Sequence, residues 1–85
     1  REIARMIDLP SSNVEEGTAS LIEAVKGLNQ TMGIPSAIRD LRVEEADFRR
    51  HLDGMAANAL EDMCTKGNPR SPSHADIRMI LEQAW

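Results

Sequence analysis

Residues 44–63 read EEADFRRHLDGMAANALEDM, and this stretch decides the fold class. Its apolar side chains recur every three or four residues, at Phe48, Leu52, Met55, Ala59 and Met63. That spacing follows the turn of an α-helix and places all five side chains on one face. Glu44, Glu45 and Asp47 load the first turn with negative charge, which suits the positive end of a helix dipole. The stretch therefore predicts a helix with one buried face.

A second amphipathic helix is predicted upstream. Asn13 is a residue type typical of an N-cap, and Glu16 three residues later suits a capping box. The apolar positions that follow predict another buried stripe, at Leu21, Val25, Leu28 and Met32. Gly33 fits the residue just beyond a helix end, and Pro35 blocks continuation. We therefore expect this helix to end at about Met32.

The connecting segments are shorter. Residues 2–7 carry one apolar helical turn, and residues 9–13 break it with a proline and polar side chains. Residues 34–42 form a connector with one helical turn at residues 36–40. Three apolar side chains are expected to pin the connector to the core: Ile34, Ile38 and Leu41.

The last part of the chain holds a loop and a terminal helix. Residues 64–72 are dense in turn-forming residues and are not expected to form a regular helix. Ser73 and Asp76 then have the spacing of a capping box, so a final helix is predicted over residues 74–84. No stretch alternates apolar and polar residues as a strand does. The sequence therefore predicts an all-α fold, a small helical bundle of about four helices in one domain over residues 1–85.

Composition excludes several classes of protein. Hydrophobic residues make up 41% and charged residues 28% of the 85 residues, and the net charge is −4. An acidic chain is a poor match to nucleic acid, whose phosphates require a basic surface. No apolar run approaches the ~18 residues that suggest a membrane span. One cysteine without a partner fits a reducing cytoplasm. We expect a cytoplasmic protein that binds neither nucleic acid nor membrane.

Candidate chemical groups are few. His51 and His74 are far apart in sequence and have no second ligand four residues away, so the sequence contains no helical zinc motif. Cys64 is expected at the C-terminal end of a helix, where the dipole disfavours a thiolate, and is interpreted as a buried packing residue. On these observations alone, the two broad apolar faces favour an independent helical module for protein interaction or oligomerisation.

Residues 59–70, ALEDMCTKGNPR, add a second line of inference. They resemble the carboxyl-terminal signature of iron-containing alcohol dehydrogenases, Ala-Leu-x-Asp-x-Cys-Thr-x-x-Asn-Pro-Arg. Residues 32–35 and 41–48 are similar to the family's Gly-Ile-Pro and Gly-Val-x-Glu-Glu-Asp-Phe stretches, although Arg42 stands where that second stretch commonly has glycine. The Ala84-Trp85 ending is similar to that of lactaldehyde reductase-like members. The resemblance covers nearly the whole chain.

The resemblance implies a fold and an activity. The chain would be the carboxyl-terminal part of the all-helical domain in a dehydroquinate synthase-like fold, without the amino-terminal nucleotide-binding domain. The full-length enzyme would interconvert alcohols and aldehydes or ketones by hydride transfer with NAD(P), assisted by iron held by one aspartate and three histidines. This piece would form one wall of the active-site cleft and would be inactive alone. A homo-oligomer is possible within this interpretation.

The resemblance assigns one site residue. Cys64 matches a family cysteine near the substrate pocket, so it is expected to line that pocket without being catalytic. Neither His51 nor His74 falls at a family ligand position, and the family's metal ligands and glycine-rich cofactor motif lie upstream of these residues. We therefore expect no catalytic, cofactor-binding or metal residue here, and neither iron nor NAD(P) bound by these 85 residues. The expected partners are the nucleotide-binding domain and a small alcohol or aldehyde.

Overall fold

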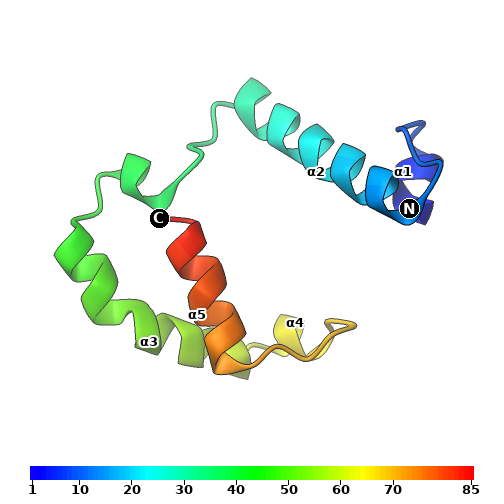
Figure 1. Cartoon of the computed structure of the whole chain (residues 1–85). Helices are drawn as coiled ribbons and strands as arrows, with labels where there is room; N and C mark the ends of the chain where they lie inside the picture. Colours follow the sequence, from blue (N-terminus) through cyan, green and yellow to red (C-terminus); the bar gives the residue numbers. More distant parts are fainter. The chain divides into compact units, whose positions relative to one another are not determined.

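The computed structural model describes all residues from Arg1 to Trp85. The chain forms two compact helical units, Arg1–Ser36 and Ala37–Trp85 (Figure 1). The first holds two helices, α1 (Glu2–Met6) and α2 (Val14–Thr31). The second holds a short 3₁₀ helix, η1 (Ile38–Leu41), and three α-helices, α3 (Glu45–Glu61), α4 (Met63–Lys66) and α5 (His74–Gln83). No strand is present, so the all-α prediction is confirmed, with α4 as an unpredicted fifth α-helix.

The start of α2 is capped by Asn13, as the sequence predicted. The Asn13 side chain accepts a hydrogen bond from the backbone N–H of Glu16 at 2.8 Å. The carboxylate of Glu16 binds Ser12 instead of completing the predicted box on Asn13: it accepts bonds from the hydroxyl and the backbone N–H of Ser12, both at 2.6 Å. These two bonds lower the pKa of Glu16 below its ordinary value, the hydroxyl bond having the larger effect.

Gly33 ends α2 as predicted. Its φ of 69° is in the left-handed region that glycine adopts without steric cost. The backbone N–H of Gly33 bonds the carbonyl of Gln30 at 3.1 Å, and the N–H of Ile34 bonds the carbonyl of Asn29 at 2.9 Å. This pair of bonds is a Schellman motif, which satisfies carbonyls left free at a helix end.

The predicted buried stripe of α2 is largely exposed. Val25, Leu28 and Met32 are 51%, 57% and 57% exposed, and Leu21 alone of the four is half-buried. The only other helix in this unit, α1, is five residues long. It packs near the start of α2, where Gly17 is buried, so the rest of the apolar face has no partner within the unit.

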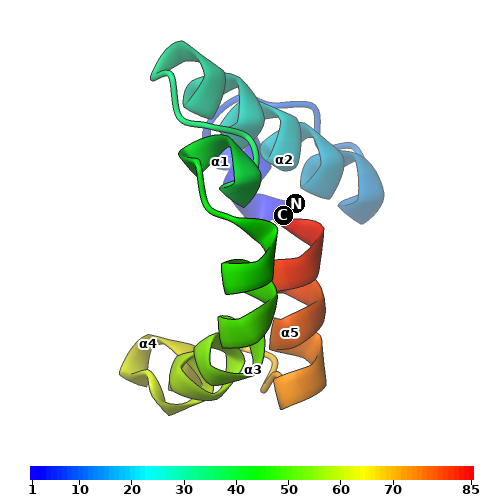
Figure 2. The ribbon, with the colours of Figure 1, turned by 90° about the vertical axis from the view of Figure 1, so that its left-hand side faces the viewer.

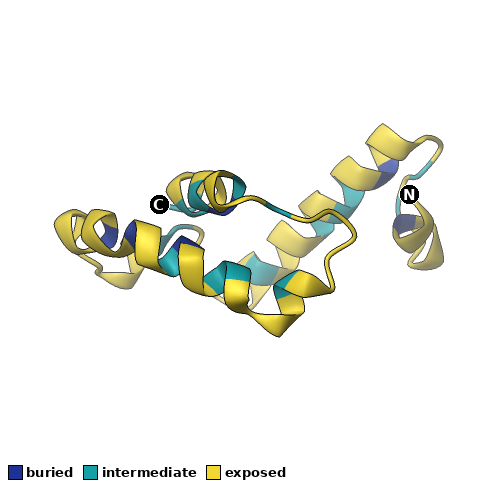
Figure 3. Ribbon diagram, turned by 90° about the horizontal axis from the view of Figure 1, so that it is seen from below, coloured by how far each residue is buried: buried dark blue, intermediate teal, exposed yellow.

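In the second unit, α3 and α5 pack side by side (Figures 1 and 2). The core between them is small, and Figure 3 shows how few turns of the ribbon are buried. Its members are Phe48, Leu52, Ala56 and Ile77. The ring of Trp85 stacks on Phe48 with a centroid separation of 4.6 Å and an interplanar angle of 24°. Of the face predicted from residues 44–63, Phe48 and Leu52 are therefore part of this core, and Met55 and Ala59 are half-buried.

Three further apolar positions depart from the predicted burial. Met63 is 83% exposed because α3 ends at Glu61, before the predicted stripe is complete. Ile34 and Leu41 are also exposed. Ile38 is half-buried, and its backbone N–H bonds the carbonyl of Ala84 at 2.8 Å. Of the three predicted pins, Ile38 alone is held in this way, through the backbone at the end of α5.

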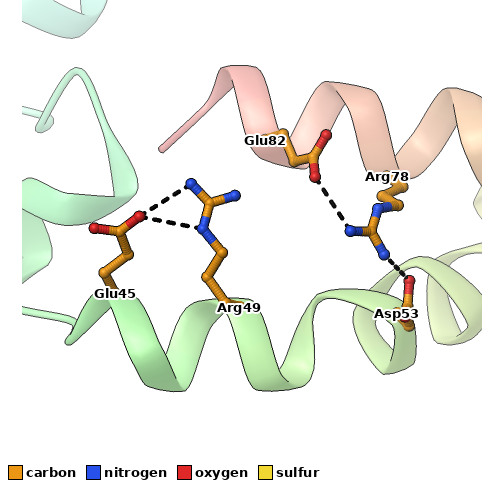
Figure 4. A network of polar contacts seen from close by, with 5 residues as sticks. All are labelled: Glu45, Arg49, Asp53, Arg78 and Glu82. Carbon is orange, nitrogen blue, oxygen red and sulfur yellow. Dashed lines mark hydrogen bonds and ion pairs between the residues drawn. The ribbon is translucent and has the colours of Figure 1, made fainter.

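Charged side chains reinforce the α3–α5 pair on its surface. Arg78 of α5 forms an ion pair with Asp53 of α3 and a second with Glu82 at 3.3 Å (Figure 4). The hydrogen bond and the charge of Asp53 raise the pKa of Arg78 above its ordinary value, and Glu82 raises it by a smaller amount. On α3 itself, Arg49 bonds Glu45 at 3.0 and 3.1 Å (Figure 4). Exposed ion pairs contribute little stability individually, so the packing of apolar side chains remains the main contribution to the stability of the α3–α5 pair.

Arg42 adopts a backbone conformation that suits glycine. It follows η1 with φ 60° and ψ 33°, in the left-handed region. An L-residue with a side chain there costs about 1–2 kcal/mol of conformational energy. We expect Arg42→Gly to raise the free energy of unfolding of the second unit by about 0.5–1 kcal/mol, part of the gain being offset by glycine's larger chain entropy. Urea unfolding of both proteins checks this, and a loss of stability would show that the arginine side chain contributes more than its strain.

Candidate functional site

An open hollow of about 430 Å³ lies in the second unit, around α4, the loop after it and α5. Its lining combines apolar and polar side chains, namely Ala59, Cys64, Thr65, Asn68, Pro72, Ile77 and Ile80. Ile77 is also part of the buried core, so one side of the hollow rests on the best-packed part of the unit. Hydroxyl, thiol and amide groups lie beside this apolar surface. The arrangement suits a small molecule with an apolar body and a polar end.

Asp62 separates α3 from α4. Its backbone is extended, with φ −64° and ψ 134°, so the α3 helix stops at Glu61. Its side chain accepts a hydrogen bond from the backbone N–H of Cys64 at 2.7 Å, which caps the start of α4. The predicted helix over residues 44–63 is therefore interrupted at Asp62, and the predicted absence of regular helix over residues 64–72 is wrong for residues 64–66.

The loop after α4 is tied together by its own polar groups. The backbone N–H of Asn68 bonds the carbonyl of Thr65 at 3.1 Å. The side-chain amide of Asn68 donates to the carbonyl of Arg70. The guanidinium of Arg70 lies 3.8 Å from the carboxylate of Asp76, an exposed and long ion pair. These contacts hold the Asn68 side of the hollow close to the start of α5.

Ser73 and Asp76 form the predicted capping box at the start of α5. The backbone N–H of Asp76 bonds the Ser73 hydroxyl oxygen at 3.1 Å, and the Asp76 carboxylate accepts from the Ser73 backbone N–H at 2.8 Å. The Ser73 hydroxyl also donates to the carboxylate at 2.7 Å. The backbone bond, then the hydroxyl bond, lowers the pKa of Asp76 below its ordinary value of 3.8. The prediction made from sequence is confirmed here.

This capping box makes stability depend on pH in the acid range. Because the pKa of Asp76 is lowered on folding, its contribution is present above about pH 4 and is lost as the pH falls through the lowered value. We expect the free energy of unfolding to fall as the pH is lowered below about 4, and to fall less in Asp76→Asn, which cannot take up the proton. Urea midpoints measured across this range test it. Identical acid slopes in the two proteins would contradict the assignment.

Cys64 is an exposed free thiol at the hollow. The expectation of a buried packing residue is wrong, because the break at Asp62 moves Cys64 from a helix end into the first turn of α4. Its family-based assignment to a substrate pocket is a separate matter, and its position in the lining is compatible with it. The two histidines are exposed, as expected, and each ring bonds a backbone carbonyl: His51 with Asp47 at 2.8 Å and His74 with Asp53 at 3.2 Å.

The side chains of this chain do not fit an iron site. No group of three His, Cys, Asp or Glu side chains is placed where it could hold a metal ion. A metal centre built from one aspartate and three histidines therefore cannot be assembled from these residues. None of the helices is both long and apolar enough to cross a membrane.

Comparison with known proteins identifies the family. The whole chain, residues 1–85, matches the family described as "Fe-containing alcohol dehydrogenase family, C-terminal". The chain belongs to the iron-containing alcohol dehydrogenases. An aldehyde-alcohol dehydrogenase of Streptococcus pneumoniae is 38% identical over 85 residues, which are 100% of this chain and 10% of that protein. The family inferred from residues 59–70 is thus confirmed.

Two further dehydrogenases show the same partial coverage. The lactaldehyde reductase of Escherichia coli K12 is 37% identical over 87 residues, covering 100% of this chain and 22% of that enzyme. An NADPH-dependent butanol dehydrogenase of Clostridium saccharobutylicum is 35% identical over 81 residues, covering 95% of this chain and 21% of that enzyme. The chain therefore spans about a tenth to a fifth of the length of these dehydrogenases.

Sequence reasoning missed one residue that shapes the hollow. Asp62 was recognised as part of the family signature but was given no role. A signal was available, because an aspartate two residues before a backbone N–H is well placed to cap a new helix. The residues on both sides of Asp62 favour helix, so the sequence predicted one continuous helix and the capping role of Asp62 was not recognised. In this member of the iron-containing alcohol dehydrogenases, the spacing of Asp62 and Cys64 thus has a structural explanation.

Proposed function

We propose that this chain is the carboxyl-terminal helical part of an oxidoreductase that interconverts alcohols and aldehydes or ketones by metal-assisted hydride transfer with NAD(P). Its role is to form one wall of the active-site cleft, with Cys64 lining the substrate pocket. The observation that carries the proposal is the coincidence of the family signature, residues 59–70, with the hollow around α4. Four of the seven lining residues lie within that signature: Ala59, Cys64, Thr65 and Asn68.

The remaining parts of the enzyme must come from outside these 85 residues. The polar groups described above supply no metal site, so iron and NAD(P) belong to an amino-terminal nucleotide-binding domain and to the rest of the helical domain. The relatives are several times longer than this chain, which leaves ample length for both. A free exposed thiol is stable in a reducing compartment, and we place the enzyme in the cytoplasm.

The contribution of the hollow would be to bind and orient the substrate. Ile77, Ile80 and Ala59 offer apolar surface to a short carbon chain. Thr65 and Asn68 offer hydrogen-bonding groups to a polar end. Orientation of this kind accelerates a reaction because the reacting atoms no longer lose freedom at the transition state. No residue of this chain is assigned a proton or hydride transfer.

The test uses the full-length natural protein, loaded with Fe²⁺ and assayed with NAD⁺ and NADP⁺ against butan-1-ol and propane-1,2-diol. We expect oxidation of a short alcohol that disappears when iron is removed. Cys64→Trp fills part of the hollow and is expected to raise the KM for the alcohol at least tenfold, as a lost pocket contact does. Met63→Trp, at the exposed neighbouring position, is the matched control and should leave KM unchanged.

Two results would contradict the proposal. If neither alcohol were oxidised in an iron-dependent way with either nucleotide, the proposed dehydrogenase activity would be wrong. If Cys64→Trp and Met63→Trp had equal KM values, the hollow would not be part of the substrate pocket, although the proposed activity could still be correct. Both measurements use the same protein preparations.

A second candidate function is favoured by the exposed apolar face of α2. A helical interaction module, including one that forms a homo-oligomer, would use Val25, Leu28 and Met32 for a partner. Sedimentation of the full-length protein and of its Leu28→Glu variant distinguishes the two. Dissociation of an oligomer by Leu28→Glu with unchanged alcohol oxidation would support the module as an additional function. A fall in folded, active enzyme would instead indicate that the face packs within the same polypeptide.

A further inference from the structure

We propose that Asp62 is a positioning residue of the substrate pocket: by capping α4 it interrupts the helix of α3 and brings Cys64 to the wall of the hollow. This inference rests on the proposed function, in which the hollow accepts the substrate. It assigns Asp62 no contact with the substrate, because Asp62 is absent from the lining residues.

Two oxygen atoms of Asp62 organise the first turn of α4. The side-chain oxygen accepts from the backbone N–H of Cys64 at 2.7 Å, and the backbone carbonyl accepts from the N–H of Thr65 at 3.2 Å. The first N–H groups of a helix have no partner within the helix, so an N-cap side chain determines whether the helix begins there. Both groups that Asp62 binds belong to residues that line the hollow.

Without this cap, nothing in the local sequence separates α3 from α4. Residues 55–66 contain neither glycine nor proline, and most are good helix formers. In an uninterrupted helix each residue advances about 100° around the axis, so Cys64 would lie about 140° from Ala59. Ala59 lines the hollow, and a side chain at that angle would face away from it. The break at Asp62 is therefore what places Ala59 and Cys64 on the same hollow.

The chain provides a matched cap in its other unit, on a residue that does not line the hollow. Asn13 caps α2 in the first unit through the same kind of bond, from the backbone N–H of Glu16 at 2.8 Å. Removing either cap leaves backbone N–H groups without a partner and destabilises one helix start by a similar amount. The two variants therefore share a stability effect and differ in whether Cys64 is repositioned.

Steady-state kinetics of the full-length, iron-loaded enzyme test the inference, with butan-1-ol and propane-1,2-diol as substrates. We expect Asp62→Ala to raise KM about tenfold with kcat within about twofold, the change produced by one lost pocket contact. Asp62→Asn should restore KM, because asparagine caps as well as aspartate. Asn13→Ala should lower Tm comparably and leave KM unchanged. Cys64→Ala should also raise KM, and the double variant Asp62→Ala/Cys64→Ala should show no further increase, since both changes remove one contribution.

The outcomes separate this inference from the proposed function. An unchanged KM in Asp62→Ala, beside a raised KM in Cys64→Ala, overturns the positioning role and leaves the pocket in place. Additive effects in the double variant, or no rescue by Asp62→Asn, also overturn it. If KM is unchanged in both single variants, Cys64 does not line the substrate pocket, and the positioning role of Asp62 is wrong as well. If Asp62→Ala does not fold, Asp62→Glu replaces it, because glutamate keeps the charge and favours a continuous helix but is not among the preferred N-cap residues.

Discussion

Phe48→Ala is expected to lower the free energy of unfolding of the second unit by about 3–5 kcal/mol, the usual cost of removing a buried aromatic side chain. Phe48 is 3% exposed and belongs to a core of four residues in this unit. It also provides the surface on which the Trp85 ring stacks at 4.6 Å. A domain this small rarely has more than ~3–5 kcal/mol of stability, so the unit should be largely unfolded.

Phe48→Leu is the matched control, because it keeps most of the apolar volume and removes only the ring. Its expected loss is about 1–2 kcal/mol, made up of the aromatic pairing energy and imperfect repacking. Amide hydrogen exchange of α3 and α5 in the 85-residue chain measures both variants locally. A loss below about 1 kcal/mol for Phe48→Ala would mean that Phe48 is not central to the core, a result at odds with the energetics of buried aromatic residues.

Gly17→Ala is expected to destabilise the first unit by about 1–3 kcal/mol, the usual cost of forcing extra atoms into a packed contact. A Cβ atom at Gly17 would lie 2.8 Å from the Cα atom of Arg1 and 3.3 Å from its Cβ atom. The nearer atom is backbone, so the Arg1 end of α1 would have to shift. Gly17 is therefore the position that lets the two helices approach closely.

Gly27→Ala, in the same helix, should have the opposite sign. No atom lies within 4 Å of a Cβ built at Gly27, so alanine adds only its higher helix propensity, a gain of about 1 kcal/mol. Urea unfolding followed by far-ultraviolet circular dichroism compares the two variants. If Gly17→Ala were as stabilising as Gly27→Ala, the close packing of α1 on α2 would be refuted.

Helix boundaries set by local chemistry were predictable from the sequence. Asn13, Gly33 and Ser73 act through hydrogen bonds to residues no more than five positions away, and each ends or begins a helix where expected. Asp62 also acts locally, but the segments on both sides of it favour helix, so the apolar spacing predicted one helix across it. The end of α3 depends on whether the Asp62 side chain caps a new helix or the first helix continues, and the spacing of apolar residues does not measure that competition.

Burial was predicted less well than helix position. An apolar stripe shows that a face can be buried, but the partner that buries it is determined by tertiary packing. Phe48 and Leu52 meet α5 and are buried. Leu28 and Met32 belong to an equally regular stripe, and no element of their own unit reaches them. The sequence pattern is the same in both helices, and only the neighbouring elements differ.

The candidate site was predictable only through the family signature. Cys64 was picked out by its place in residues 59–70, whereas helix periodicity and dipole arguments gave it a buried position that the structure contradicts. The other lining residues of the hollow come from α3, α4, the loop and α5, and they lie up to 21 positions apart in sequence, from Ala59 to Ile80. Their convergence depends on how α5 packs on α3, and no local pattern encodes that packing.

The stacking of Trp85 on Phe48 has a practical consequence for spectroscopy. The chain contains one tryptophan and no tyrosine, so its intrinsic fluorescence arises from a single indole in Ala37–Trp85. The unit Arg1–Ser36 emits nothing under the same excitation. Emission and a backbone-sensitive signal therefore separate the unfolding of one unit from that of the other in the unlabelled, unsubstituted chain.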